Sequence, residues 1–220
     1  MIATLQGMLR EGLSTVTDAR LVADRRQAMG LDRDSFGLAM AVSAVVTMAG
    51  TVLPEINGVG LAVSKALGDD DPLLRDAASC GAIGVALAGL TVLLVWRGPA
   101  AASWLAARFG GRPDQKAAAC WIYLSTLAAA VVTLGVIVVD LVGGLLVEAM
   151  PGPVAIASLL VSGGALVFLL ALATMLSGHL LGLVGQARRL GFTLLWLGLL
   201  VLASLAIGIP AYYLFGGDIA

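Results

Sequence analysis

One loop of the chain combines glycines with cations in a way that could hold a phosphate group. It reads GGRPDQK from Gly110 to Lys116. A phosphate-binding loop of the nucleotide-hydrolase type needs a glycine, four residues, then Gly-Lys followed by Ser or Thr, so that backbone amides wrap the phosphates. In this chain no glycine directly precedes Lys116 and no Ser or Thr follows it, so the motif does not match. The sequence therefore predicts a turn in which Arg112 and Lys116 hold the loop at an anionic membrane face.

The single histidine, His179, is the other candidate for chemistry. It lies two residues after Ser177 in the stretch MLSGHLLG, and residues two apart on a helix point to different sides, so the two cannot act together. One histidine cannot build the usual zinc site, and the two cysteines lack metal-ligand spacing. We therefore predict no catalytic residue, no bound metal, no cofactor and a protein that is not an enzyme.

The elements that carry these residues are long uncharged runs. Hydrophobic residues make up 60% of the 220 residues and charged residues 12%, whereas soluble domains carry about 25% charged residues. A helix needs about 20 consecutive apolar residues to span a bilayer. The sequence therefore predicts an all-α polytopic protein with a five-helix membrane domain over residues 36–215. The predicted spans are residues 36–53, 77–96, 117–139, 154–177 and 190–210, and none contains an ionisable Asp, Glu, Lys, Arg or His.

Cations are distributed unevenly between the segments that connect the spans. With the N-terminus inside, eleven of the thirteen Lys and Arg residues fall on the inner side, and only Lys65 and Arg75 fall outside. Because cations resist translocation, we predict a cytoplasmic N-terminus and a periplasmic C-terminus. Cys80 and Cys120 then start neighbouring spans on opposite faces, roughly 30 Å apart. This separation predicts two free thiols.

Three segments outside the spans have apolar faces. Residues 1–35 form a predicted cytoplasmic or interfacial segment with an amphipathic helix between Thr15 and Gly30, capped by Asp18. This helix can lie on the inner headgroups or pack against the loops of its own bundle, and both remain open. The outer acidic loop, 54–76, has an apolar stripe that we expect on the bilayer surface, made of Ile56, Val59, Val63 and Leu67. Aspartates follow at 69, 70, 71 and 76. The inner basic loop, 97–116, has an interfacial segment after Pro99.

Three stretches of the chain resemble the bacterial Yip-one family of five-span membrane proteins. They are ARLVADRRQAMGLDRDSFGLAM before the first span, GGRPDQKAAACW before the third, and MLSGHLLGLVGQARRLGFTLL before the last. The resemblance covers about residues 18 to 210 and implies a five-helix bundle with a cytoplasmic N-terminus. Eukaryotic relatives are associated with Rab GTPases, but the Asp-Leu-Tyr-Gly-Pro stretch usual in them is missing here. Binding of a Rab-type GTPase is therefore not expected.

These features predict a protein that acts by binding. We expect an accessory or assembly subunit of a membrane protein complex, or a membrane-organising protein, with the bilayer and other membrane proteins or further copies as partners and no nucleic acid. The Arg-rich, Ala-rich and Gly-rich composition is typical of GC-rich bacteria and favours the inner (cytoplasmic) membrane. Arg188 and Arg189, in the turn before the last span, could also serve only to anchor the chain at the membrane face. The candidate interaction residues are Gly110, Gly111, Arg112, His179, Arg188 and Arg189.

The alternative is the membrane component of a transporter or a channel-like oligomer. Proton-driven and sodium-driven carriers keep ionisable residues within their spans, and the predicted spans have none. Transport would instead need a polar stripe of hydroxyl groups, although such groups usually bond their own helix backbone. The candidates for this stripe are Ser125, Thr126, Thr133, Ser162 and Thr174.

Overall fold

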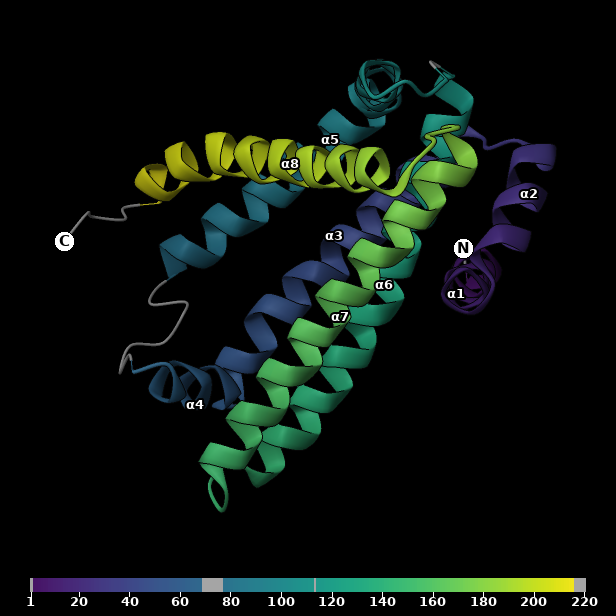
Figure 1. Cartoon of the computed structure of the whole chain (residues 1–220). Coiled ribbons are helices and arrows are strands. Elements are labelled where there is room, and N and C mark those ends of the chain that lie inside the picture. Colours follow the sequence, from purple (N-terminus) through teal and green to yellow (C-terminus); the bar gives the residue numbers. More distant parts are fainter. Residues whose placement is uncertain (1, 69–76, 113, 216–220) are drawn as a thin grey trace.

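The computed structural model describes residues 2–68, 77–112 and 114–215. These residues form helices joined by short turns, with no strand among them (Figure 1). Five of these helices are long and apolar enough to cross a membrane, which confirms the predicted all-α polytopic architecture. The helices are α1 (Ile2–Thr17), α2 (Ala19–Met29), α3 (Arg33–Ile56), α4 (Val59–Ala66), α5 (Ala77–Arg108), α6 (Gln115–Leu146), α7 (Pro151–Leu180) and α8 (Gln186–Leu214).

Short polar side chains fix where several helices begin. Asp18 accepts a hydrogen bond from the Leu21 amide at 3.3 Å and caps α2, and Asp32 accepts one from the Ser35 amide at 2.8 Å and caps α3. These bonds satisfy amides that have no partner inside the helix. Gly30 ends α2 with a φ of 77°, a conformation that favours glycine. The cap and stop of α2 are therefore those that the sequence predicts.

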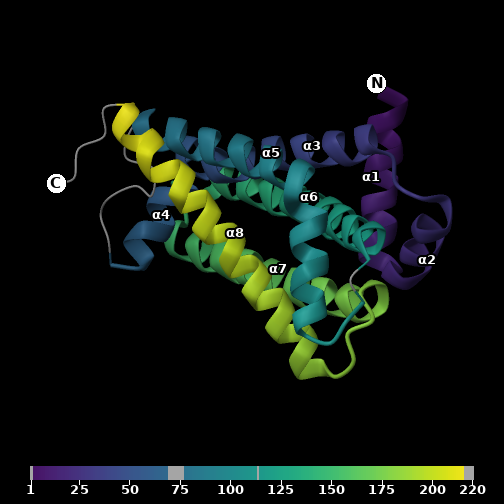
Figure 2. The same cartoon turned by 90° about the horizontal axis from the view of Figure 1, so that it is seen from above.

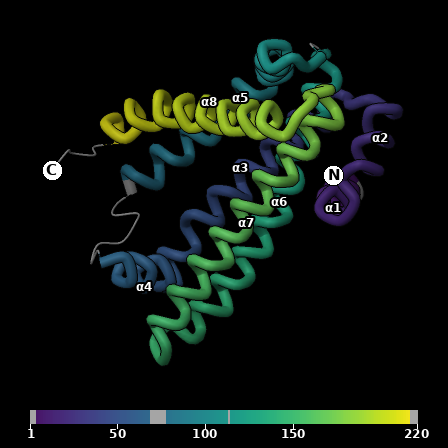
Figure 3. The backbone as a smooth tube through the Cα atoms, in the orientation of Figure 1, coloured from purple at the N-terminus to yellow at the C-terminus, as the bar shows by residue number. Residues whose placement is uncertain are grey.

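The long helices form two arms that meet at one end of the molecule. In one arm α5 lies along α8, and in the other α6 lies between α3 and α7. The arms diverge away from the end that carries the α5–α6 and α7–α8 loops, as the tube in Figure 3 shows. We call this the basic end, because Arg108, Arg112, Arg188 and Arg189 lie there. It is the end that the charge distribution predicts to be cytoplasmic.

The predicted inner loop 97–116 is mostly helical. The helix of the second span does not end at Trp96, because α5 continues to Arg108 with Pro99 inside it. Proline removes one backbone hydrogen bond and bends a helix, and α5 turns sharply before its last turns (Figure 2). This final part buries Ala102, Leu105 and Ala106 against the core of the bundle. One face of the segment after Pro99, which the sequence predicts to be interfacial, is therefore buried in the protein core.

The predicted outer loop 54–76 also contains folded structure. The helix of the first span continues to Ile56, and α4 then packs against α7. Val59 and Val63 of the predicted stripe are buried against Val154 and Ala155 of α7, while Ile56 and Leu67 are exposed. Half of the stripe therefore covers the end of α7 and is not available to lie on a bilayer. The aspartates at 69, 70, 71 and 76 lie outside the described residues.

The N-terminal segment forms two helices that pack on the bundle, and the sequence predicts only the second. Ala19, Val22 and Ala23 of α2 are buried, and α2 contacts α6 and α7. The sequence left open whether this helix lies on the inner headgroups or packs on its own bundle, and in the structure it packs on its own bundle. The helix α1 crosses α6 (Figure 2). Gly12 comes so close that a Cβ there would lie 3.1 Å from the Leu127 carbonyl oxygen.

A carboxyl group lies inside the third membrane-length helix. The sequence predicts that this span ends at Val139 with Asp140 in the outer loop, but α6 continues to Leu146 and Asp140 is only 4% exposed. Its Oδ1 accepts a hydrogen bond from the Ser158 hydroxyl of α7 at 2.8 Å, and its backbone carbonyl accepts one from the side-chain amide of Asn57, through Nδ2, at 2.9 Å. The bonds join α6, α7 and the α3–α4 turn, so a structural role accounts for this ionisable residue.

We expect Ser158→Ala to lower the free energy of unfolding by about 1 kcal/mol, because it removes one interhelical hydrogen bond and leaves a buried carboxyl oxygen without that donor. Unfolding of the purified protein by SDS in mixed micelles measures the change. Ser162→Ala, one turn along the same helix and exposed, is the control. Equal stability of the two variants would contradict this role for the Asp140–Ser158 bond.

Candidate functional site

The glycine loop and the α7–α8 loop pack directly on each other at the basic end. The Arg112 amide donates a hydrogen bond to the Leu181 carbonyl at 2.8 Å, and the Gly111 amide donates one to the Ala106 carbonyl at 2.9 Å. A Cβ at Gly111 would lie 2.7 Å from the Leu181 carbonyl oxygen, so only glycine allows this approach. Gly110 has a φ of 79°, which other residues rarely adopt. The glycine pair therefore serves close packing between two loops of the same chain.

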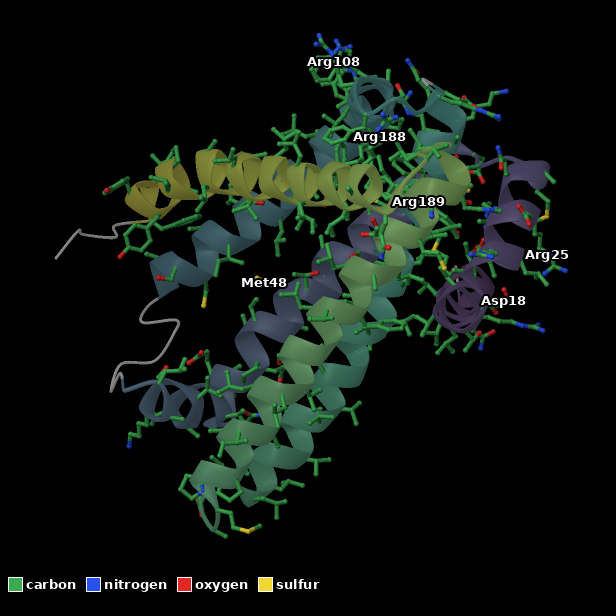
Figure 4. All side chains as sticks on the ribbon, viewed as in Figure 1. Asp18, Arg25, Met48, Arg108, Arg188 and Arg189 are labelled. Atoms are coloured by element: carbon green, nitrogen blue, oxygen red, sulfur yellow. The ribbon has the colours of Figure 1, made fainter. Side chains whose placement is uncertain are left out.

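Arg188 and Arg189, at the start of α8, lie where the glycine loop meets the α7–α8 loop. The Arg189 Nε donates a hydrogen bond to the Leu183 carbonyl at 2.8 Å, and its side chain lies against Gly178. A Cβ at Gly110 would come within 3.0 Å of Arg188 Nη1. Figure 4 shows both arginines at this end of the molecule, with Arg108 beyond them. Arg189 thus stabilises its own loop, as expected for a cation near backbone carbonyls.

His179 ends α7 and faces a different neighbour. Its Nε2 lies 2.6 Å from Asp24 Oδ1 of α2, and both side chains are partly open to solvent. An exposed pair of this kind contributes about 0–1 kcal/mol. The contact therefore holds α2 near α7 only weakly.

The structure brings all six predicted interaction residues to the basic end. Gly110, Gly111 and Arg112 meet the α7–α8 loop, and Arg188 and Arg189 lie beside them. His179 is on the side that faces α2. Several of their polar groups are used within the chain, so part of what the sequence presents as an interaction surface is internal packing. Their role toward a partner stays a prediction.

A second polar cluster lies where α1, α2 and α6 meet, and the sequence does not predict it. Arg26 pairs with Glu11 through two hydrogen bonds, one of them from Nε to Oε1 at 2.7 Å. The Tyr123 hydroxyl donates to Glu11 Oε2 at 2.9 Å and accepts from Arg26 Nη2 at 3.1 Å. The guanidinium carbon also lies 4.9 Å from the centre of the Tyr123 ring. We call this set of three residues the clasp.

The clasp neutralises two charges beside the apolar part of the bundle. The side chains of Glu11 and Arg26 are each 18% exposed. The hydrogen bond from Arg26 to Glu11 raises the pKa of the guanidinium above its ordinary value and outweighs the opposing effect of burial. Arg26 is therefore a protonated partner for Glu11 at neutral pH. No local sequence pattern links residues 11, 26 and 123. The one feature of the sequence that could have pointed to the clasp is Tyr123, whose hydroxyl group lies near the start of an uncharged predicted span.

A cavity lies between the five long helices. Its volume is about 220 Å³, and residues of α3, α5, α6, α7 and α8 line it. Trp121 and Trp196 form part of its wall with an edge-to-face contact at 5.8 Å between ring centres. Its lining residues include no charged side chain. Its hydroxyl-bearing residues are Ser43, Thr47, Thr91, Ser125, Thr126 and Thr193.

The cavity contains only part of the polar stripe that the sequence suggests. Ser125 and Thr126 line it. Ser162 is instead exposed on the surface of α7, and Thr174 donates its hydroxyl proton to the Leu170 carbonyl of its own helix at 2.7 Å. Thr133 packs its methyl group toward Gly50 of α3. The remaining hydroxyls come from three other helices, whose relative rotation no local sequence pattern reveals.

Comparison of the chain with protein-family models, with curated proteins and with solved structures gives no match. The fold itself therefore supplies the classification. Five helices of sufficient length and apolarity define a multi-pass membrane protein.

The clasp should behave as one energetically coupled unit. We expect Glu11→Gln and Arg26→Met each to destabilise the protein, because each leaves the other partner largely buried without its counter-charge. The double variant should be more stable than the sum of the single changes predicts, with a coupling of about 1 kcal/mol or more. Thermal unfolding in mild detergent measures all three. Arg25→Met, at the neighbouring exposed arginine, is the control, and strict additivity would exclude the coupling.

Proposed function

We propose that this chain is a non-enzymatic integral membrane protein of the bacterial inner membrane that acts by binding other membrane proteins. It would serve as an accessory or assembly subunit, or as a membrane-organising protein. The arginine distribution and the composition support the cytoplasmic membrane and an inner N-terminus. The resemblance to the bacterial Yip-one family is part of the same proposal, and the five membrane-length helices are compatible with it.

The observation that carries the proposal is an open patch of small residues on α7. A Cβ at Gly163 or Gly164 would meet nothing within 4 Å, and the adjacent Ser162 is exposed. By contrast, Gly50 of α3 and Gly89 of α5 lie against side chains of neighbouring helices. In lipid, small residues allow close helix approach, because burial of apolar surface gains little there. The α7 patch is therefore free to receive a helix from another protein.

Large apolar side chains surround this patch. Leu160, Leu166 and Val167 are all well exposed on the same helix. Such side chains suit lipid or a helix packed into the gap that the glycines leave. The patch thus has the low centre and apolar rim expected of a helix-packing surface.

We expect the double substitution Gly163→Leu with Gly164→Leu to remove partner proteins that co-purify with the chain in mild detergent, because the leucines fill the space that a partner helix would occupy. Quantitative mass spectrometry of the purified complexes measures the loss. Gly198→Leu on α8, where a Cβ also meets nothing within 4 Å, is the matched control. An unchanged set of proteins in the double variant, or recovery of the wild-type chain alone in several detergents, would refute the role of this patch.

A membrane component of a transporter is the second candidate, and the hydroxyl-bearing cavity favours it. The cavity lies between all five long helices, and ligand pockets of helix bundles often lie between the helices. For this function we expect the protein, reconstituted alone or with its co-purified subunit, to move a small uncharged solute across sealed vesicles. Radiolabelled glycerol uptake, with empty vesicles as control, tests this, and uptake equal to that of the control would remove the transport proposal for solutes of that class.

A further inference from the structure

The N-terminal helix α1 lies across one face of α6. Figure 1 shows α1 end-on beside α6, so its axis runs across the long helices. Gly12 lies directly on α6, because a Cβ there would lie 2.7 Å from Val131 Cγ2 and 3.1 Å from the Leu127 carbonyl oxygen. Leu127 is about 15 Å along the helix from Ala117, where the uncharged run of α6 begins. The contact therefore lies within the apolar part of α6 and not at its end.

Three leucines form an exposed stripe along α1. Leu5, Leu9 and Leu13 recur every four residues and so lie on one face of the helix. They are 36%, 47% and 50% exposed, and we call them the leucine stripe. The face that contacts α6 is a separate one, which carries the buried Met8 and Gly12. The stripe is therefore available to something outside the described part of the chain.

The clasp determines which way the leucine stripe points. The Glu11 carboxylate turns toward Tyr123, which is closer than Leu127 to the basic end of α6. Leu9 and Leu13 each lie two residues from Glu11, and a helix turns by about 200° over two residues. The stripe therefore points away from the basic end, along α6.

The face of α6 beyond α1 is open and apolar. Leu127, Val131, Leu134 and Val138 recur at spacings of three and four residues, so they share one face of α6. Leu127, at the contact with α1, is only 3% exposed, whereas Leu134 and Val138 are 39% and 60% exposed. Exposed apolar side chains in the middle of a membrane-length helix suit lipid chains. The leucine stripe and this part of α6 are neighbouring parts of one apolar surface.

The remaining face of α1 is polar. Gln6 and Arg10 lie one turn apart and are exposed, and a long arginine side chain can reach the headgroups from an apolar position. The charge of Glu11 would be costly beside hydrocarbon, but the clasp pairs it with Arg26. An apolar face next to a polar one is the arrangement of a helix that lies in the plane of a membrane.

We propose that α1 is an in-plane membrane helix whose leucine stripe inserts among the lipid acyl chains of the leaflet at the basic end. Lipid is the partner, because the stripe continues the exposed apolar face of α6, and because burial of apolar surface between proteins gains little in lipid. Since α1 does not cross the bilayer, it takes up area in one leaflet only. This role is separate from the α7 patch and does not depend on the proposed binding of membrane proteins.

Spin labels on the full chain in vesicles of phosphatidylethanolamine and phosphatidylglycerol test the proposal. A nitroxide is attached at Leu9→Cys or Leu13→Cys in a chain whose two native cysteines are replaced by alanine. Electron paramagnetic resonance then measures its collisions with oxygen, which dissolves in lipid, and with a nickel chelate, which stays in water. We expect both labels to favour oxygen, as a label at Leu134→Cys should, and a label at Gln6→Cys to favour nickel.

The unsubstituted chain provides an independent measurement. Phosphatidylcholine with a diazirine in the middle of one acyl chain, added to the same vesicles, should label the leucine stripe on irradiation. Mass spectrometry of the digested protein locates the labels. Labels on α6 without any on the stripe would contradict insertion of α1.

Replacement of the leucines tests whether they cause the insertion. Leu9→Gln with Leu13→Gln should shift a label at Leu5→Cys from oxygen contact to nickel contact. Leu21→Gln with Met29→Gln, the same change at two exposed apolar residues of α2, should leave that label unchanged. Nickel contact at Leu9 and Leu13 in the otherwise unsubstituted stripe would place it in water. Poor contact with both reagents would place it under a second copy or another protein, and either result would overturn the proposal.

Discussion

The structure depends on the rule that hydrocarbon offers no hydrogen bonds to a protein. Backbone groups in the long helices satisfy each other, and polar side chains beside them are stabilised by pairing with groups of the same chain. Two clusters of side chains follow this rule. Glu11, Arg26 and Tyr123 pair with each other at the clasp, and Asp140 pairs with Ser158 near the opposite end of α6. Each cluster joins helices that are distant in sequence.

These polar contacts orient the bundle, because apolar contact between helices in lipid is only weakly selective. The clasp holds α1 and α2 on one side of α6, and the Asp140 cluster aligns α6 with α7 and the α3–α4 turn. At the basic end the two loops lock together through the Arg112 amide. The α6–α7 arm is therefore pinned at both ends. The α5–α8 arm diverges from it away from the basic end (Figure 3).

The divergence of the arms explains where space remains in the molecule. The cavity lies at the meeting of the five long helices, and a groove of about 360 Å³ lies between α3 and α5. Small residues have two distinct uses in this arrangement. Gly50 and Gly111 let segments of the chain approach closely, whereas Gly163 and Gly164 leave an open surface. The former serve the packing of the chain itself, and the latter form the surface on which the proposed binding of membrane proteins depends.

Local sequence alone determined the membrane class, the five long helices and the cap and stop of α2. An uncharged run of about 20 residues has few alternatives to a membrane helix, and Asp18 and Gly30 act on amides and dihedrals within their own turn. Only the tertiary structure decided that α5 continues past Pro99, that Asp140 is buried within α6, and that Glu11 meets Arg26 and Tyr123. It also decided which glycines are packed and which are open. The physical reason is that these outcomes depend on how helices rotate and pair, and residues far apart in the chain set that pairing.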